Sequence, residues 1–251
     1  MTAPGSAELR DVYEDQYSGS GEEGALYRRW RDLCAQGKAE HVVALAAGLP
    51  DPPRSLVEVG CGDGGLLEAL ASRGLGDSFH GYDISERAVQ IASGRPVIDR
   101  VERFDGELLP VAPATYDVGV LSHVLEHVPN PLPLLRETAR ACRAVVVEVP
   151  LEDNRSASRP AAERGREALG HLHRFSRDDM HRLASEAGLD VARELADPLP
   201  LEVHMFWAAG PAARVRAFAK AVVRRGLFTV APRAAERAFT VHYAALLVPR
   251  P

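Results

Sequence analysis

The chain has 251 residues, of which 46% are hydrophobic and 26% are charged, so it can bury a sizeable core as one large α/β unit or two small domains. No apolar run reaches the ~18 residues that a membrane span needs, and residues 1–17 are too acidic for a secretory signal. A net charge of −5 argues against general affinity for nucleic acid or anionic membranes, and three widely spaced cysteines argue against a disulfide framework. We therefore expect a cytoplasmic protein without membrane attachment.

Strand and helix patterns alternate along the first 150 residues, after an acidic leader rich in glycine and serine. The strands are apolar throughout and the connections between elements are short, which indicates a doubly wound, mostly parallel sheet with helices on both faces. The predicted elements, in chain order, are a helix at 25–49, a strand at 55–59, a helix at 66–72, a strand at 78–82, a helix from Ser85 through Ser93, strands at 97–104 and 116–121, a helix opened by Pro131 or Pro133, and a strand at 144–149.

The pattern loosens after the fifth strand. Residues 151–170 are polar and predict a loop. Ser176 and Asp179 form the S-x-x-D signal that begins a helix, and Gly188 ends that helix. Two more strands follow, at 189–195 and 242–248, and they are separated by an insert at 196–241. An insert of this length inside a compact domain is usually functional.

The insert combines positive charge with apolar surface. Residues 211–237 hold seven basic residues and one acidic residue, which fits a solvated helix face or a surface for an anionic substrate group. Its apolar residues either pack on the sheet or form a cap over a partly apolar substrate; they are Leu199, Leu201, His204, Met205, Phe206 and Trp207, then Val215, Phe218, Ala219, Val222 and Val223.

A glycine-rich turn follows the first strand. Gly60, Gly62 and Gly65 satisfy the pattern G-x-G-x-x-G, and the next helix begins directly after them. Glycines let the chain turn tightly and let a ligand approach the backbone, while a helix N-terminus adds amide donors. This pattern alone fits a nucleotide site or a purely structural turn.

Two aspartates follow the next two strands. Asp83 comes 19 residues after Gly64, a separation at which a carboxylate accepts hydrogen bonds from both ribose hydroxyls. Asp105 follows the third strand, where it can accept from an adenine amino group. Because the carboxyl ends of parallel strands meet at one edge of the sheet, we expect the glycine turn and both aspartates on that edge.

In combination, these features resemble a class I S-adenosylmethionine-dependent methyltransferase, of the large group that acts mostly on small molecules. The matching stretches lie within residues 55–190: they are 57–64, 81–84, 104–110, 116–128 (YDVGVLSHVLEHV) and, more weakly, 170–176 (GHLHRFS). The resemblance implies seven strands in the order 3-2-1-4-5-7-6, with the seventh antiparallel and the helical insert between strands 6 and 7.

The resemblance also implies roles for single residues. The glycine turn would line the methionine part of S-adenosylmethionine, Glu58 would orient its amino group, Asp83 would hold the ribose, and Asp105 would read the adenine. Ser122 and His123 would flank the sulfonium. The full set of cofactor-binding residues is Glu58, Gly60, Cys61, Gly62, Gly64, Asp83, Ile84, Asp105, Gly106, Ser122 and His123. The family often uses the region before the first strand as a lid, for which the candidates are Tyr13, Tyr17, Trp30 and Lys38.

Methyl transfer from a sulfonium is an in-line displacement, so the protein mainly positions and desolvates the reactants. A base assists when the acceptor is a hydroxyl, and the candidates are His123 and His171. A helix over the Ser122–His127 stretch would place His123, Glu126 and His127 on one face. The pair Glu126–His127 is then a structural support for the cofactor loop, or these three residues and His171 bind a metal ion. We assign no metal, because relatives with a metal here have glutamate where His123 stands.

We predict that the chain transfers a methyl group from S-adenosylmethionine to an oxygen or nitrogen of a small-molecule acceptor, with S-adenosylhomocysteine as the product. The tailored insert favours a specialised metabolite as the acceptor. The competing functions are a nicotinamide-dependent oxidoreductase and a protein that binds the cofactor without turnover. We expect a helical lid at 1–50, a core at 51–195 and 242–251, and a substrate cap at 196–241. The sequence leaves the oligomeric state open.

Overall fold

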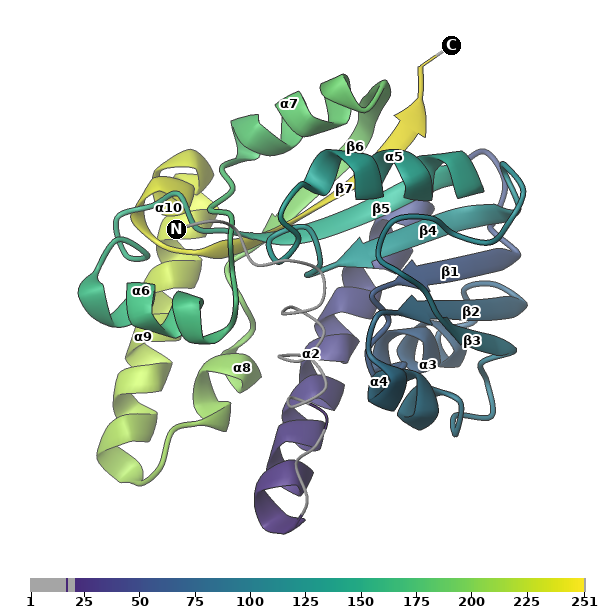
Figure 1. Cartoon of the computed structure of the whole chain (residues 1–251). Coiled ribbons are helices and arrows are strands. Elements are labelled where there is room, and N and C mark those ends of the chain that lie inside the picture. Colours follow the sequence, from purple (N-terminus) through teal and green to yellow (C-terminus); the bar gives the residue numbers. More distant parts are fainter. Residues whose placement is uncertain (1–16, 18–20, 251) are drawn as a thin grey trace.

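The computed structural model describes Tyr17 and residues 21–250 as a seven-stranded sheet with helices around it (Figure 1). The elements are α2 (Gly21–Ala46), β1 (Ser55–Val59), α3 (Gly65–Ser72), β2 (Ser78–Asp83), α4 (Glu86–Ala92), β3 (Arg100–Arg103), β4 (Tyr116–Ser122), α5 (Pro131–Ala141), β5 (Cys142–Leu151), α6 (Pro160–Ala168), α7 (Arg177–Glu186), β6 (Leu189–Asp197), α8 (Leu201–Phe206), α9 (Pro211–Val230), α10 (Pro232–Ala238) and β7 (Val241–Pro249).

The strand order is β3-β2-β1-β4-β5-β7-β6, which confirms the order that the family resemblance implied. Strands β1 to β5 are parallel to one another, while β7 runs antiparallel to both β5 and β6. The carboxyl ends of β1 to β5 therefore meet at one edge of the sheet, which we call the rim. The first residues of the antiparallel β7 lie at the same edge, since His242 pairs with Pro150 near the end of β5.

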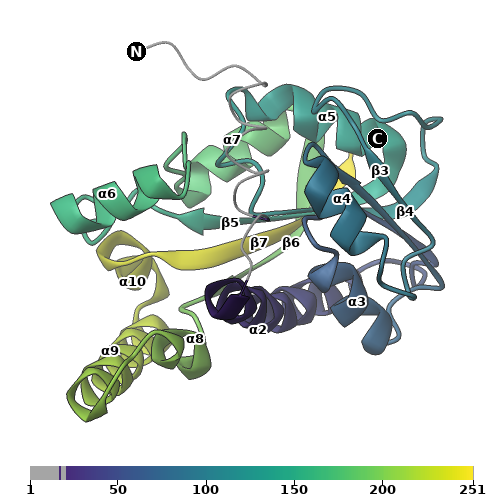
Figure 2. The ribbon, with the colours of Figure 1, turned by 60° about the horizontal axis from the view of Figure 1, so that its bottom comes forward.

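Alternate side chains of the central strands supply two cores, one on each face of the sheet. On β5, Val145 and Val147 join one core, whereas Val146 joins the other. The first core is covered by α5 and α7, and the second by α2 and α3 (Figure 2). Both faces of the strands are thus dry, which explains why their sequences are continuously apolar.

Two predicted elements differ from the structure. The residues expected to form a loop at 151–170 include α6. Because α6 buries none of its side chains, no stripe of apolar residues predicted it. The strand predicted at 97–104 is shortened to β3, an edge strand that pairs only with β2 among the described strands.

The insert forms α8, α9 and α10; α8 and α9 extend away from the sheet, whereas α10 lies beside β7 and its Ala235 joins the first core (Figure 2). The proposed packing of its apolar helix face on the sheet is wrong, because Val215, Phe218, Val222 and Val223 of α9 are all more than half exposed. The buried residue of α9 is Ala221 instead. None of the described helices has the length and apolar content that a bilayer span requires.

Candidate functional site

The turn after β1 has a left-handed backbone at three glycines. Gly60, Gly62 and Gly64 have φ angles of 79°, 54° and 75°, which residues with a Cβ rarely adopt. A Cβ on Gly60 would lie 2.5 Å from Cγ2 of Val124, and a Cβ on Gly62 would collide with the hydroxyl of Tyr17. The turn therefore presents bare backbone at the rim.

Glu58 lies beneath this turn. Its side chain is buried, and its Oε2 has no hydrogen-bond partner among the described residues. Burial raises the pKa of Glu58 well above its usual range. A buried carboxyl group without a partner fits the ammonium group of a ligand, which would supply both a donor and a compensating charge.

Cys61, also predicted to line the site, turns its side chain away from the rim. The thiol is buried, and its Sγ would lie 2.7 Å from a Cβ on Gly81 in the sheet. Burial raises the pKa of the thiol well above its usual range. Cys61 can therefore offer a ligand only its backbone.

Asp83 lies at the end of β2 beside the glycine turn. Its Oδ2 accepts a hydrogen bond from the backbone N–H of Gly62 at 2.8 Å, and its Oδ1 accepts one from Ser85 at 2.9 Å. A carboxylate oxygen can accept two hydrogen bonds, so this group has the capacity to hold the turn and to receive sugar hydroxyls. The structure thus brings Asp83 and the glycine turn together, as the sequence predicted.

Ile84, Asp105 and Gly106 form the next part of the rim. The Cγ2 atom of Ile84 lies 3.5 Å from the position of a Cβ on Gly106, which has a φ angle of 88°. Asp105 is exposed, and its Oδ1 accepts from the backbone N–H groups of Leu108 and Glu107, which lower its pKa. Its second oxygen can serve a donor on a ligand.

The Ser122–His127 stretch, considered above as a helix, forms instead the end of β4 and a turn. His123 has a φ angle of 58° and donates its backbone N–H to the carbonyl of Glu148 at 2.8 Å, a geometry that no helix permits. Its ring Nδ1 lies 3.0 Å from Oε1 of the buried Glu126. Its Nε2 has no hydrogen-bond partner among the described residues.

The turn separates the residues that we considered as one metal set. Glu126, His127 and His171 bring ligand atoms within 4.8 Å of one another, but His123 is not part of that group. Nδ1 of His171 lies 2.8 Å from Oε2 of Glu152, and burial lowers the pKa of His127 to about 4. The predicted base candidates His123 and His171 therefore belong to two different clusters.

The second cluster surrounds Glu148, which the sequence analysis missed. Oε1 of Glu148 lies 3.3 Å from Nδ1 of His41, 3.3 Å from Nδ1 of His242 and 3.6 Å from Nε2 of His123. Its other oxygen accepts from the hydroxyl of Ser122 at 3.4 Å. The available sequence signal was a lone charge within the apolar strand Val145-Val146-Val147-Glu148-Val149.

Electrostatics favour the charged forms of Glu148 and His41 but the neutral form of His242. Burial opposes the ionisation of Glu148, but its contacts with His123, His242 and His41 keep its pKa well below the usual range. Burial also opposes the protonation of His41, but Asp197 and Glu148 raise its pKa to about 9. Burial and the neighbouring His123 lower the pKa of His242.

The residues suggested as a lid take different positions. Tyr13 lies outside the described residues, whereas the hydroxyl of Tyr17 lies against Gly62. Lys38 of α2 is near enough to act electrostatically on Glu58 and His123. Trp30 packs instead against the insert, with ring centroids 5.0 Å from Phe206 and 5.6 Å from Trp207.

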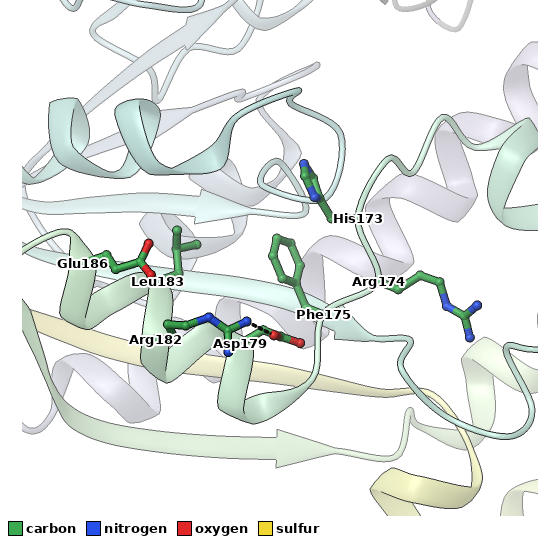
Figure 3. Close-up of a pocket in the computed structure, with 7 residues that line it drawn as sticks. All are labelled: His173, Arg174, Phe175, Asp179, Arg182, Leu183 and Glu186. Carbon is green, nitrogen blue, oxygen red and sulfur yellow. Dashed lines mark hydrogen bonds and ion pairs between the residues drawn. The ribbon is translucent and has the colours of Figure 1, made fainter. Parts of the chain in front are cut away.

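A surface pocket beside α7 does not belong to the rim (Figure 3). Its aromatic wall is formed by His173 and Phe175, whose rings are stacked 5.5 Å apart. Two of its charged groups are engaged with each other, since Asp179 accepts the capping hydrogen bonds of α7 and pairs with Arg182. We therefore place the functional site at the rim.

Known proteins match this chain in sequence and in fold. It is 32% identical over 161 residues to a ubiquinone biosynthesis O-methyltransferase from Bordetella avium strain 197N, covering 58% of this chain and 63% of that protein. The enzyme of the same name from Nitrosomonas europaea is 31% identical over 113 residues, covering 43% of this chain and 46% of that protein. The chain thus spans less than two thirds of these curated relatives.

A solved structure shares the fold. Geranyl diphosphate C-methyltransferase from Streptomyces coelicolor A3(2) superposes with a TM-score of 0.62 at 16% identity, over 85% of this chain and 77% of that one. The family model described as a methyltransferase domain matches residues 27–194, which include the rim from Glu58 to His171. With the seven-stranded sheet and the glycine turn, this match shows that the chain belongs to the class I S-adenosylmethionine-dependent methyltransferases.

Proposed function

We propose that the chain transfers the methyl group of S-adenosylmethionine to an oxygen or nitrogen of a small-molecule acceptor. The carrying observation is the buried carboxyl of Glu58, without a partner for its Oε2 among the described residues, beneath a left-handed glycine turn. The curated relatives are O-methyltransferases by name, which favours oxygen as the accepting atom. The insert and its apolar residues favour a specialised metabolite as the acceptor.

The rim fits S-adenosylmethionine group by group. Glu58 would bind the amino group, and the bare backbone at Gly60, Gly62 and Gly64 would line the methionine part. Asp83 would receive the ribose hydroxyls. The adenine would lie against Ile84, with the Asp105 carboxylate and the Gly106 amide at its edge, and the Cys61 backbone would complete the turn.

Once bound, the cofactor supplies an activated methyl group on its sulfonium. The chain's own residues bind both reactants, align them and exclude water, which can contribute about 7–11 kcal/mol to the reduction of the barrier. Ser122 and His123 would flank the reacting atoms. His123 and His171 remain the candidate bases for a hydroxyl acceptor, and a base contributes about 10²–10⁴-fold to the rate.

We propose that α2 and the residues before it act as a lid and that the insert at 196–241 acts as a substrate cap. The aromatic contacts from Trp30 to Phe206 and Trp207 support this, because they join the two segments on one side of the rim. We also propose a cytoplasmic location, which the three free cysteines support.

Calorimetric titration with S-adenosylhomocysteine and, separately, with NAD⁺ tests the cofactor assignment. We expect binding of the first and none of the second. Asp83→Ala should weaken binding at least about tenfold, because it removes charge-assisted hydrogen bonds worth about 1.5–3 kcal/mol each. The control is Asp190→Ala, which removes the exposed ion pair between Asp190 of β6 and Arg250. Binding of NAD⁺ but not of S-adenosylhomocysteine would overturn the assignment, and so would equal affinity of Asp83→Ala and Asp190→Ala for S-adenosylhomocysteine.

Turnover is a separate question from binding. We expect S-adenosylhomocysteine to form when the protein is incubated with S-adenosylmethionine and a panel of hydroxyl and amine acceptors. Tight cofactor binding without product across such a panel would support a protein that binds the cofactor without turnover. His123→Ala or His171→Ala with an unchanged rate at saturating cofactor would remove that residue as a base.

A further inference from the structure

The carboxylate of Glu148 is surrounded by imidazole nitrogens from three distant parts of the chain. Glu148 lies on β5 and is 1% exposed, while His41 comes from α2, His123 follows β4, and His242 lies on β7. Nitrogen atoms of all three rings lie 3.3–3.6 Å from the same oxygen, Oε1. The contact from His123 is too long for a good hydrogen bond, so hydrogen bonding alone does not account for the arrangement.

The spacing matches the ligands of a bound metal ion. A tetrahedral ion with bonds of about 2.0–2.2 Å separates its ligand atoms by about 3.3–3.6 Å. Oε1 of Glu148 lies 3.3 Å from Nδ1 of His242 and 3.6 Å from Nε2 of His123. Ligand atoms of these three residues all lie within 4.8 Å of one another.

The surrounding residues hold the donors in the orientation that a metal requires. Nδ1 of His123 is engaged by the buried carboxylate of Glu126 at 3.0 Å, which directs Nε2, a buried atom without a partner among the described residues, toward Glu148. Glu148 is itself contacted by the hydroxyl of Ser122 and by His41, whose Nε2 lies 3.4 Å from Asp197. Carboxylate partners behind ligating histidines are a regular feature of metal sites.

We propose that His123, Glu148 and His242 bind a first-row divalent transition metal ion such as Zn²⁺. Two imidazoles and one carboxylate suit this class of ion, whereas Mg²⁺ and Ca²⁺ prefer oxygen ligands throughout. Three protein ligands leave a tetrahedral ion one open position. Since Ser122 ends β4 at the rim and His123 follows it, that position adjoins the proposed methyl-transfer site.

The ion would change the role that we predicted for His123. A histidine that ligates a metal through Nε2 cannot accept a proton there, but a hydroxyl group bound at the open position has its pKa lowered by the ion. Metal binding does not depend on the proposed methyl transfer, because it can be measured on the protein without cofactor or acceptor.

Metal content and a spectroscopic titration test the site directly. We expect the purified protein, after chelation and dialysis, to take up one equivalent of Co²⁺ with visible d–d absorption of a tetrahedral site, and Zn²⁺ to displace it. Loss of a residue behind a metal ligand typically weakens binding about 10–100-fold. Glu148→Gln and His242→Asn, which remove ligands, should each weaken Co²⁺ binding by more than that. Far-ultraviolet circular dichroism checks that each variant is folded.

Two controls separate this site from other histidines. His181→Gln removes a histidine that pairs with Glu194 on the outside of the sheet, and it should leave the Co²⁺ titration unchanged. His127→Asn reports on the neighbouring group of Glu126, His127 and His171. No Co²⁺ spectrum in the folded wild-type protein overturns the proposal, as does binding lost in His127→Asn but retained in Glu148→Gln.

Discussion

Glu58 is the residue at which cofactor binding and protonation should be coupled. Burial raises the pKa of its carboxyl in the free protein and so favours the neutral form. The ammonium group of a bound cofactor would favour the carboxylate, so the folded protein should release a proton on binding. The affinity then rises with pH and levels off once the pH passes the raised pKa of the free protein.

Calorimetry at one pH, in two buffers of different ionisation enthalpy, measures this proton release. We expect the apparent binding enthalpy of S-adenosylhomocysteine to differ between the buffers for the wild-type protein. Glu58→Gln keeps the shape of the side chain but cannot ionise, so the difference should vanish. Equal enthalpies for the wild-type protein would contradict a neutral Glu58.

At the scale of residues, the sequence predicted the site residues that lie in local motifs. The glycine turn and Asp83 follow consecutive strands at a characteristic separation, and the structure brings them together through the bond from Gly62 to Asp83. His41 and His242 gave no such signal, because they lie 201 positions apart and only the insertion of β7 beside β5 brings His242 to the rim. The left-handed conformation of His123 was equally invisible, since it depends on the carbonyl of Glu148.

Among the elements, α7 shows how far a local signal reaches. Ser176 accepts a hydrogen bond from the N–H of Asp179, and the Asp179 carboxylate accepts from the N–H of Ser176, as the S-x-x-D pattern predicted. The helix then buries Met180, Leu183 and Ala184 against the core. By contrast, α6 buries none of its side chains, so no apolar stripe marks it in the sequence. It also has no side-chain cap at its N-terminus.

Removing this cap should weaken the whole domain measurably. Ser176→Ala leaves the first N–H groups of α7 without a side-chain acceptor, and we expect the free energy of unfolding to fall by about 0.5–2 kcal/mol. Urea denaturation measures this loss. Ser93→Ala, which removes an exposed hydroxyl after α4, should change stability by less than about 0.5 kcal/mol. Equal effects of the two substitutions would contradict the capping role.

For the molecule as a whole, the sheet order depends on β7. Periodicity predicted that late strands exist, but their order and the antiparallel direction came from the family resemblance. The reason is that β7 pairs with β5 and β6 through backbone hydrogen bonds, which no side-chain pattern encodes. Whether the apolar face of α9 packs on the sheet or stays exposed was left open, because a pattern of apolar residues does not say whether another element covers it.

Leu246 of β7 tests whether the sheet unfolds as one unit. It is fully buried beneath α2, so Leu246→Ala should lower the free energy of unfolding by about 2–5 kcal/mol. The tryptophan fluorescence and circular dichroism transitions should shift together, because Trp30 of α2 and Trp207, which packs against it, report on α2 and its contact with the insert, and the dichroism reports on the whole fold. Leu108→Ala, at a residue that is 67% exposed, is the control and should have little effect. A fluorescence transition that stays in place while the dichroism shifts would show that α2 unfolds separately.

The position of β7 between β5 and β6 also sets the order of events during synthesis. β6 is synthesised before β7, yet β7 is its only pairing partner among the described strands. A nascent chain that has extended as far as the insert therefore carries an orphan strand, and it still lacks His242. The rim becomes complete only when β7 inserts between β5 and β6, so an interrupted translation product would lack His242 and would expose unpaired strand edges that favour aggregation.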